Sequence, residues 1–73
     1  MDIYKFIGKK VLLTDTDGNQ FIGRVGDYVW EDENEEFGCD AIIMDYPTRN
    51  DGYRYENPVQ FNASEIASIE ILE

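Results

Sequence analysis

The densest group of ionisable side chains in the sequence is a run of carboxylates. Residues 31–36 read EDENEE, so five of these six positions are acidic. Trp30 precedes the run and Phe37 follows it, and aromatic side chains beside charge are typical of protein interfaces. Three interpretations stay open: a solvated loop, which we favour, a docking patch for a basic protein partner, and loose binding of divalent cations. The docking patch would use seven side chains: Trp30, Glu31, Asp32, Glu33, Glu35, Glu36 and Phe37.

A second segment mixes cations with aromatic rings. Bases of single-stranded nucleic acid stack on tyrosine rings with arginine nearby, which makes this segment a candidate nucleic-acid contact. Two arginines are few for such a site. We therefore favour the interpretation that the rings cover the fold and the arginines offset neighbouring acids. The members of this Tyr/Arg cluster are Tyr46, Arg49, Tyr53, Arg54 and Tyr55.

Oxygen-bearing side chains also alternate at Asp15, Asp17 and Asn19, as at the start of a calcium loop. The sixth position of such a loop would be Gln20 where glycine permits the sharp turn, and the twelfth would be Gly26 where a bidentate glutamate is needed. The spacing therefore favours a hairpin turn over a metal site.

Residue types that support catalysis are missing. The chain has no histidine and a single cysteine, Cys39, and it contains no glycine-rich phosphate loop and no Cys/His metal spacing. We expect no enzymatic activity, no cofactor and no metal. A lone cysteine also excludes an intrachain disulfide, so we expect Cys39 to be a buried structural thiol.

Length and composition predict one small folded domain over residues 1–73. The hydrophobic share of 42% is too high for a disordered chain. The net charge of −10 argues against tight binding of phosphate backbones by the chain as a whole. That charge is uneven, because residues 31–45 hold 7 acids and no base.

Two further expectations concern location and assembly. No signal peptide or membrane-spanning segment is evident, so we expect a cytoplasmic protein. A chain of 73 residues builds only a marginal core, and oligomerisation is a common remedy.

Apolar spacing and turn formers predict the elements that position these groups. Residues 1–8 predict one or two helical turns, and Asp17-Gly18 predicts a two-residue hairpin turn. The long arm over residues 19–30 contains Gly23 and Gly26, which indicate bulges or bends.

Three more strands complete the pattern. A strand over residues 39–46 is expected to end at Pro47, and short strands over 59–61 and 67–72 flank a tight turn at Ser64-Glu65. The predicted fold is all-β: a small, strongly bent, five-stranded antiparallel barrel, closed or nearly closed, behind a short N-terminal helical turn.

The spacing of these residues resembles the Sm-like (LSM) family of SH3-like barrels. The matching positions at the start are Gly8, Lys9, Val11, Leu13, Asp17, Gly18, Phe21, Gly23, Val25 and Tyr28. Residues 59–70, VQFNASEIASIE, are similar to the family's closing pair of strands with their tight turn.

The resemblance implies a ring in which the fourth strand of one subunit pairs with the fifth strand of the next. Such pairing covers strand edges that would otherwise be exposed. It predicts a homo-oligomer with four interface residues: Val59, Phe61, Ile69 and Ile71.

Two departures from the family pattern bear on function. Family RNA binding uses an asparagine before the third strand and an Arg-Gly pair between the fourth and fifth strands. Asp40 and Asn62-Ala63 stand at these places. An aspartate repels phosphate, and the cation is missing. We therefore expect a non-enzymatic binding or scaffolding module with RNA binding weakened or lost. The alternatives are single-stranded RNA binding through the Tyr/Arg cluster and an acidic protein that binds a basic protein partner.

Overall fold

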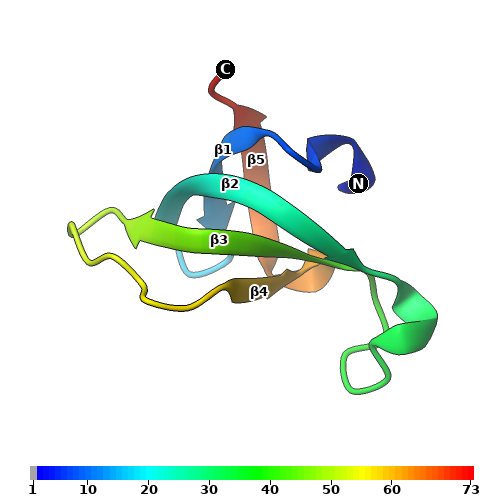
Figure 1. Ribbon diagram of the computed structural model, residues 1–73. Coiled ribbons are helices and arrows are strands. Elements are labelled where there is room, and N and C mark those ends of the chain that lie inside the picture. Colours follow the sequence, from blue (N-terminus) through cyan, green and yellow to red (C-terminus); the bar gives the residue numbers. More distant parts are fainter. Residues whose placement is uncertain (1) are drawn as a thin grey trace.

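One antiparallel sheet organises residues 2–73, the part of the chain that this computed structural model describes (Figure 1). Its strands are β1 (Lys10–Asp15), β2 (Gln20–Val29), β3 (Ala41–Arg49), β4 (Val59–Asn62) and β5 (Ile66–Ile71). Three short 3-10 helices are interspersed: η1 (Tyr4–Phe6), η2 (Glu31–Glu33) and η3 (Ala63–Glu65). The predicted all-β class, five strands and N-terminal helical turn are confirmed. Among residues 2–73, no helix has the length and apolar character needed to cross a membrane.

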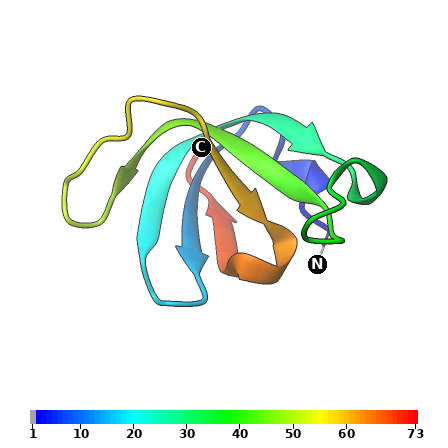
Figure 2. The ribbon, with the colours of Figure 1, turned by 90° about the horizontal axis from the view of Figure 1, so that it is seen from below.

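The sheet curls into a barrel that stays open on one side (Figure 2). The strand order is β4-β3-β2-β1-β5, so β4 and β5 are the two edges. Within residues 2–73 no ladder joins β4 to β5, and η3 alone links them along the chain. A capping box stabilises this link. The side chain of Asn62 accepts a hydrogen bond from the backbone N–H of Glu65, and the side chain of Glu65 accepts one from the backbone N–H of Asn62.

The bends in β2 occur at its glycines, as predicted. The β2–β3 register shifts between Ile22 and Arg24, where Tyr46 and Pro47 of β3 lie opposite Gly23 alone, and again between Val25 and Asp27, where Gly26 is the extra residue of β2. A Cβ atom on Gly23 would lie 3.2 Å from the Cα of Pro47, so a larger residue would crowd β3 at this point. The two bulges bend β2, so that this single long strand runs along both sides of the barrel.

The β1–β2 connection is longer than the expected two-residue turn. Asp15 N–H donates to the carbonyl of Asn19 at 2.9 Å, and Gly18 N–H donates to the carbonyl of Asp15 at 3.0 Å. Residues 16–18 therefore form a three-residue loop between Asp15 and Asn19, the last hydrogen-bonded pair. Gly18 has φ +87°, the left-handed conformation that a type I turn followed by a bulge requires.

The prediction that Pro47 ends the third strand is wrong, since β3 continues to Arg49. Pro47 lies at the bulge opposite Gly23, where the ladder is interrupted, so its missing N–H removes no strand hydrogen bond. Its carbonyl accepts a hydrogen bond from Tyr55 N–H at 2.9 Å. Tyr46, just before it, has φ +44°, a strained conformation for a residue with a side chain.

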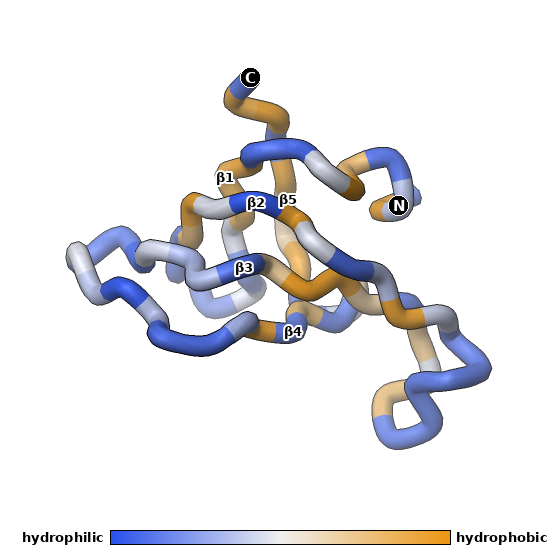
Figure 3. Tube along the Cα trace, in the orientation of Figure 1, coloured by the Kyte–Doolittle hydropathy of each residue, from blue (hydrophilic) through white to orange (hydrophobic). Residues whose placement is uncertain are grey.

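Apolar side chains from η1 and all five strands fill the concave side of the sheet. Hydrophobic residues recur along the strands, whereas the connecting loops are hydrophilic (Figure 3). Burying these side chains is the main force that holds the barrel together. The buried cluster consists of Ile3, Phe6, Val11, Leu13, Phe21, Val25, Ile42, Met44, Phe61 and Ile66.

Candidate binding surfaces

The segment between β2 and β3, residues 30–40, is held in one shape by its own hydrogen bonds; we call it the acidic loop. Asn34 is only 7% exposed. Its Nδ2 donates to the carbonyl of Cys39 at 2.8 Å and to Oδ1 of Asn62 at 2.9 Å. The five carboxylates of residues 31–36 are exposed, as a solvated loop requires. The buried Asn34 nevertheless ties this loop to the end of β4.

Asp40 fastens the other end of the acidic loop. Its Oδ1 accepts a hydrogen bond from Glu31 N–H at 2.7 Å, and its Oδ2 accepts one from the Tyr28 hydroxyl at 2.5 Å. Burial, together with this hydrogen bond, raises the pKa of Tyr28 above the ordinary tyrosine value. Asp40 therefore acts within its own chain, as an acceptor that closes the loop.

Three aromatic rings pack at the base of the acidic loop. The Trp30 ring stacks on Tyr4 with centroids 5.3 Å apart and meets the edge of Tyr28 at 4.7 Å. Trp30 remains 49% exposed. The indole is thus fixed by its neighbours, yet much of it faces solvent.

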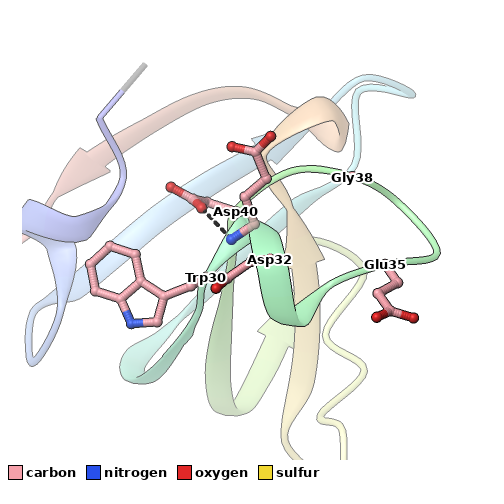
Figure 4. Close-up of a pocket in the computed structure, with 6 residues that line it drawn as sticks. Trp30, Asp32, Glu35, Gly38 and Asp40 are labelled. Atoms are coloured by element: carbon pink, nitrogen blue, oxygen red, sulfur yellow. Dashed lines mark hydrogen bonds between the residues drawn. The ribbon is translucent and has the colours of Figure 1, made fainter.

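Two grooves flank the acidic loop. The first, of about 660 Å³, we call the Trp30 groove (Figure 4). In Figure 4, Trp30 lies on one side and Glu35 on the other, with Asp32 and Asp40 between. Its lining residues are Trp30, Glu31, Asp32, Glu35, Gly38 and Asp40.

The second, of about 600 Å³, we call the Phe37 groove. It is lined by Phe37, by the polar side chains Asn34, Gln60 and Asn62, and by Glu33, Glu35, Glu36 and Glu65. The structure therefore divides the predicted docking patch between two grooves, and Glu35 lines both.

The Tyr/Arg cluster is only partly assembled. Arg49 holds Asp51 with two hydrogen bonds, Nη2 to Oδ2 at 2.7 Å and Nε to Oδ1 at 3.0 Å. Its guanidinium also lies 5.3 Å from the ring centroid of Tyr53 and donates to the Tyr55 hydroxyl at 3.2 Å. The hydrogen bonds from Arg49 lower the pKa of Asp51 to about 2. The charge of Arg49 is thus largely balanced by Asp51.

The remaining two members of the cluster stand apart from this arrangement. Tyr46 lies at the β3 bulge, and the ring pairs of the described residues join Tyr53 to Tyr55 without including it. Arg54 is exposed, and within residues 2–73 it makes no ion pair. Figures 1 and 2 also place this segment and the acidic loop at opposite ends of the molecule.

Asn62 and Ala63, where the family resemblance implies an Arg-Gly pair, form hydrogen bonds within the chain. Asn62 is buried, its Nδ2 donates to Oε1 of Glu65 at 2.6 Å, and its Oδ1 accepts from Gln60 at 3.0 Å. Ala63 N–H donates to the carbonyl of Asp40 at 2.8 Å. These residues stabilise the junction of β3, β4 and the acidic loop.

The four predicted interface residues all lie on the edge strands and share one face. Phe61 pairs with Ile42 and Val59 with Met44 on one edge. Ile69 pairs with Leu13, and Ile71 with Val11, on the other edge, and in each case the partner on the neighbouring strand faces the core. Phe61 is buried in the core of its own subunit, so only its backbone is available at the edge.

Two other predicted groups act locally. Oδ1 of Asp15 accepts hydrogen bonds from the N–H groups of Asp17 and Asn19, both at 2.9 Å, which shapes the β1–β2 turn. Among residues 2–73, no group of three or more potential ligands is arranged to hold a metal ion. Cys39 is half-buried at the end of the acidic loop, not fully buried as expected. Its thiol donates to Ser64 Oγ at 3.7 Å.

Sequence reasoning missed three residues that shape the acidic loop. Asn34 was visible as the single uncharged residue inside the acidic run, and such a break in a charge run is a usable signal. Tyr4 and Tyr28 gave no comparable signal, because their contact with Trp30 joins η1 to the far end of β2.

The bent five-stranded barrel, with a helical turn before β1 and a 3-10 turn between β4 and β5, is the Sm-like fold. A solved structure described as a novel Sm-like archaeal protein from Pyrobaculum aerophilum matches this chain with a TM-score of 0.71 and 17% sequence identity. The match covers 94% of this chain and 47% of that one, so this chain spans about half the length of that protein. No family model and no curated protein sequence matches the chain.

Proposed function

We propose that this protein is a non-enzymatic Sm-like module that forms a homo-oligomeric ring, binds or scaffolds other molecules, and has RNA binding weakened or lost. The observation that carries the proposal is the pair of unpaired edges, β4 and β5, at the two ends of one antiparallel sheet. Pairing β4 of one subunit with β5 of the next would satisfy both edges at once and repeat around a closed ring.

The apolar side chains on these edges support the same assembly. Ile71 pairs with Val11 of β1, which is fully buried, yet Ile71 is 45% exposed because, among residues 2–73, no strand pairs with the other side of β5. A neighbouring β4 would cover it and remove apolar surface from water. Val59, on the opposite edge, faces the same side of the sheet and is half-buried.

The loss of RNA binding rests on charge and on occupied polar groups. Asp40 and Asn62 stand where the fold's RNA contacts are expected, and both are hydrogen-bonded within the chain. The grooves beside them are lined by carboxylates and by no cation. Carboxylates repel the phosphates on which RNA affinity largely depends. The proposed module consists of one domain and acts in the cytoplasm.

Sedimentation of the full chain at roughly tens of micromolar tests the assembly. We expect a mass that is a multiple of the 8.5 kDa subunit. Ile71→Glu should weaken the association by at least about tenfold, because it places a charge in an apolar contact. A monomeric wild-type chain would overturn the proposal.

Ile22→Glu is the matched control for this variant. Ile22 is 43% exposed, close to the value for Ile71, but it lies on β2 in the middle of the sheet. It should leave the assembly intact. Equal dissociation by both variants would mean that the contact does not run through the β5 edge.

A further inference from the structure

The Trp30 groove offers a cationic side chain both an aromatic surface and carboxylates. The half-exposed indole lines the groove together with Asp32 and Glu35. Lysine and arginine lay apolar stems along such surfaces and keep the charged head among polar groups, and arginine also stacks on tryptophan. We propose that this groove binds an arginine- or lysine-rich segment of a partner protein.

Charge complementarity selects this occupant over an apolar or acidic one. Within residues 2–73 the ion pairs are Arg24–Glu73 and Arg49–Asp51, and neither lies at the groove. Asp32 and Glu35 make no side-chain hydrogen bond in this range, and residues 31–45 contain no base. Their charges are therefore available to a partner, and a cation in the groove relieves their mutual repulsion.

The surface is organised before a partner arrives. Asn34 and Asp40 hold the acidic loop, and Gly38 N–H donates to the carbonyl of Asn34 at 2.8 Å. The rings of Tyr4 and Tyr28 hold Trp30. Binding then orders little of the loop, which reduces the entropic cost of association.

The Phe37 groove extends the same chemistry beyond the first groove. It combines the half-exposed Phe37 ring with Glu33, Glu36 and Glu65, and it shares Glu35 with the Trp30 groove. A segment with two closely spaced cations can place one in each groove on either side of Glu35. A single isolated lysine would use only half of this surface.

The Trp30 groove does not depend on the proposed ring, whereas the Phe37 groove includes Gln60 and Asn62 of the β4 edge. All residues that line the Trp30 groove belong to the acidic loop, and none comes from β4 or β5. Assembly through those edges would leave the groove open to a partner. Binding and assembly can therefore be measured in the same sample and can fail separately.

The test uses a fluorescein-labelled octapeptide of alternating arginine and glycine, followed by fluorescence anisotropy at low ionic strength. We expect saturable binding. Asp32→Asn combined with Glu35→Gln should weaken it roughly fivefold, since each exposed charge pair contributes modestly. Trp30→Ala should weaken it about three- to fivefold, and Trp30→Tyr should restore most of the loss.

A second pair of substitutions separates this groove from general attraction to an acidic protein. Asp17→Asn combined with Glu56→Gln removes the same charge at exposed positions outside both grooves, and it should change the affinity less than about twofold. Equal weakening by both pairs would overturn the inference, as would absence of peptide binding to the folded wild-type chain. Peptide binding by a monomer would support this inference while removing the ring.

Discussion

Single polar residues in this protein mostly serve the chain itself. Asp40 closes the acidic loop, Asn62 caps the turn before β5, and Arg49 is held by Asp51. From the sequence, Arg49 was a candidate nucleic-acid contact, whereas Asp40 and Asn62 were departures from the family's RNA-binding pattern. A side chain whose hydrogen bonds are already made must exchange them for contacts to a ligand, so little net free energy remains for binding.

The acidic titration of Asp51 tests the Arg49 contact directly. The folded pKa of about 2 lies below the ordinary aspartate value, so the pair stabilises the loop above about pH 4 and loses this effect as the pH falls toward 2. Carboxyl NMR should show the Asp51 midpoint near pH 2. In Arg49→Gln the midpoint should rise toward the ordinary value.

Arg54→Gln is the control for that titration, because Arg54 forms no ion pair within residues 2–73. It should leave the Asp51 midpoint unchanged. A wild-type midpoint at the ordinary aspartate value would contradict the bidentate contact.

Among the elements, the acidic loop shows how buried polar contacts can order a highly charged segment. Like charges extend a chain, and a run such as residues 31–36 would be loose by itself. Asn34 opposes this by turning inward, where its amide satisfies Cys39 and Asn62. This buried amide therefore helps to fix the loop that lies between the two grooves.

Replacing Asn34 with alanine should destabilise the protein by about 1 to 3 kcal/mol, because the buried Oδ1 of Asn62 and the carbonyl of Cys39 both lose a donor. Denaturant unfolding measures the change. Amide exchange at Glu33 and Gly38 should accelerate more than exchange in β2. Glu36→Ala, at an exposed position in the same loop, should stay within about 0.5 kcal/mol of wild type.

For the whole molecule, the fold separates two kinds of surface. The acidic loop lies at one end of the barrel and the Tyr/Arg cluster at the other (Figures 1 and 2). The two open edges are β4 and β5, the first and last strands in the order of the sheet. The Trp30 groove contains no residue of β4 or β5, so the proposed partner and the proposed ring need not compete for it. The neutralised Arg49 leaves the opposite end with little positive charge.

Titration of labelled oligo-U and oligo-A at low salt tests this view of the surface. We expect no binding at roughly micromolar protein, because too few free cations remain to release counterions from the phosphates. Tight binding that weakens steeply with salt, and disappears in Arg49→Ala combined with Arg54→Ala, would instead restore the nucleic-acid interpretation.

The sequence by itself determined the strands, the bends at Gly23 and Gly26, the turn at Ser64-Glu65 and the concentration of charge. These features depend on alternation and on glycine conformations, which are local properties of the chain. They were sufficient to predict a small, bent, five-stranded barrel, and the Sm-like family entered through the resemblance of the residue spacing. The mistakes at Pro47 and at the β1–β2 turn arose because bulges and turn lengths depend on register between strands.

Only the tertiary structure decided which side chains are already bonded or packed within the chain and which remain exposed to a partner. Asn34 meets Asn62 across 28 positions of sequence, and Trp30 meets Tyr4 from a different element. Burial and hydrogen-bond partners of this kind are set by the packing of distant segments, which no local pattern encodes. The structure thus left Asp32, Glu35 and Trp30 open to a partner, while it engaged Arg49 and Asp40 within the chain.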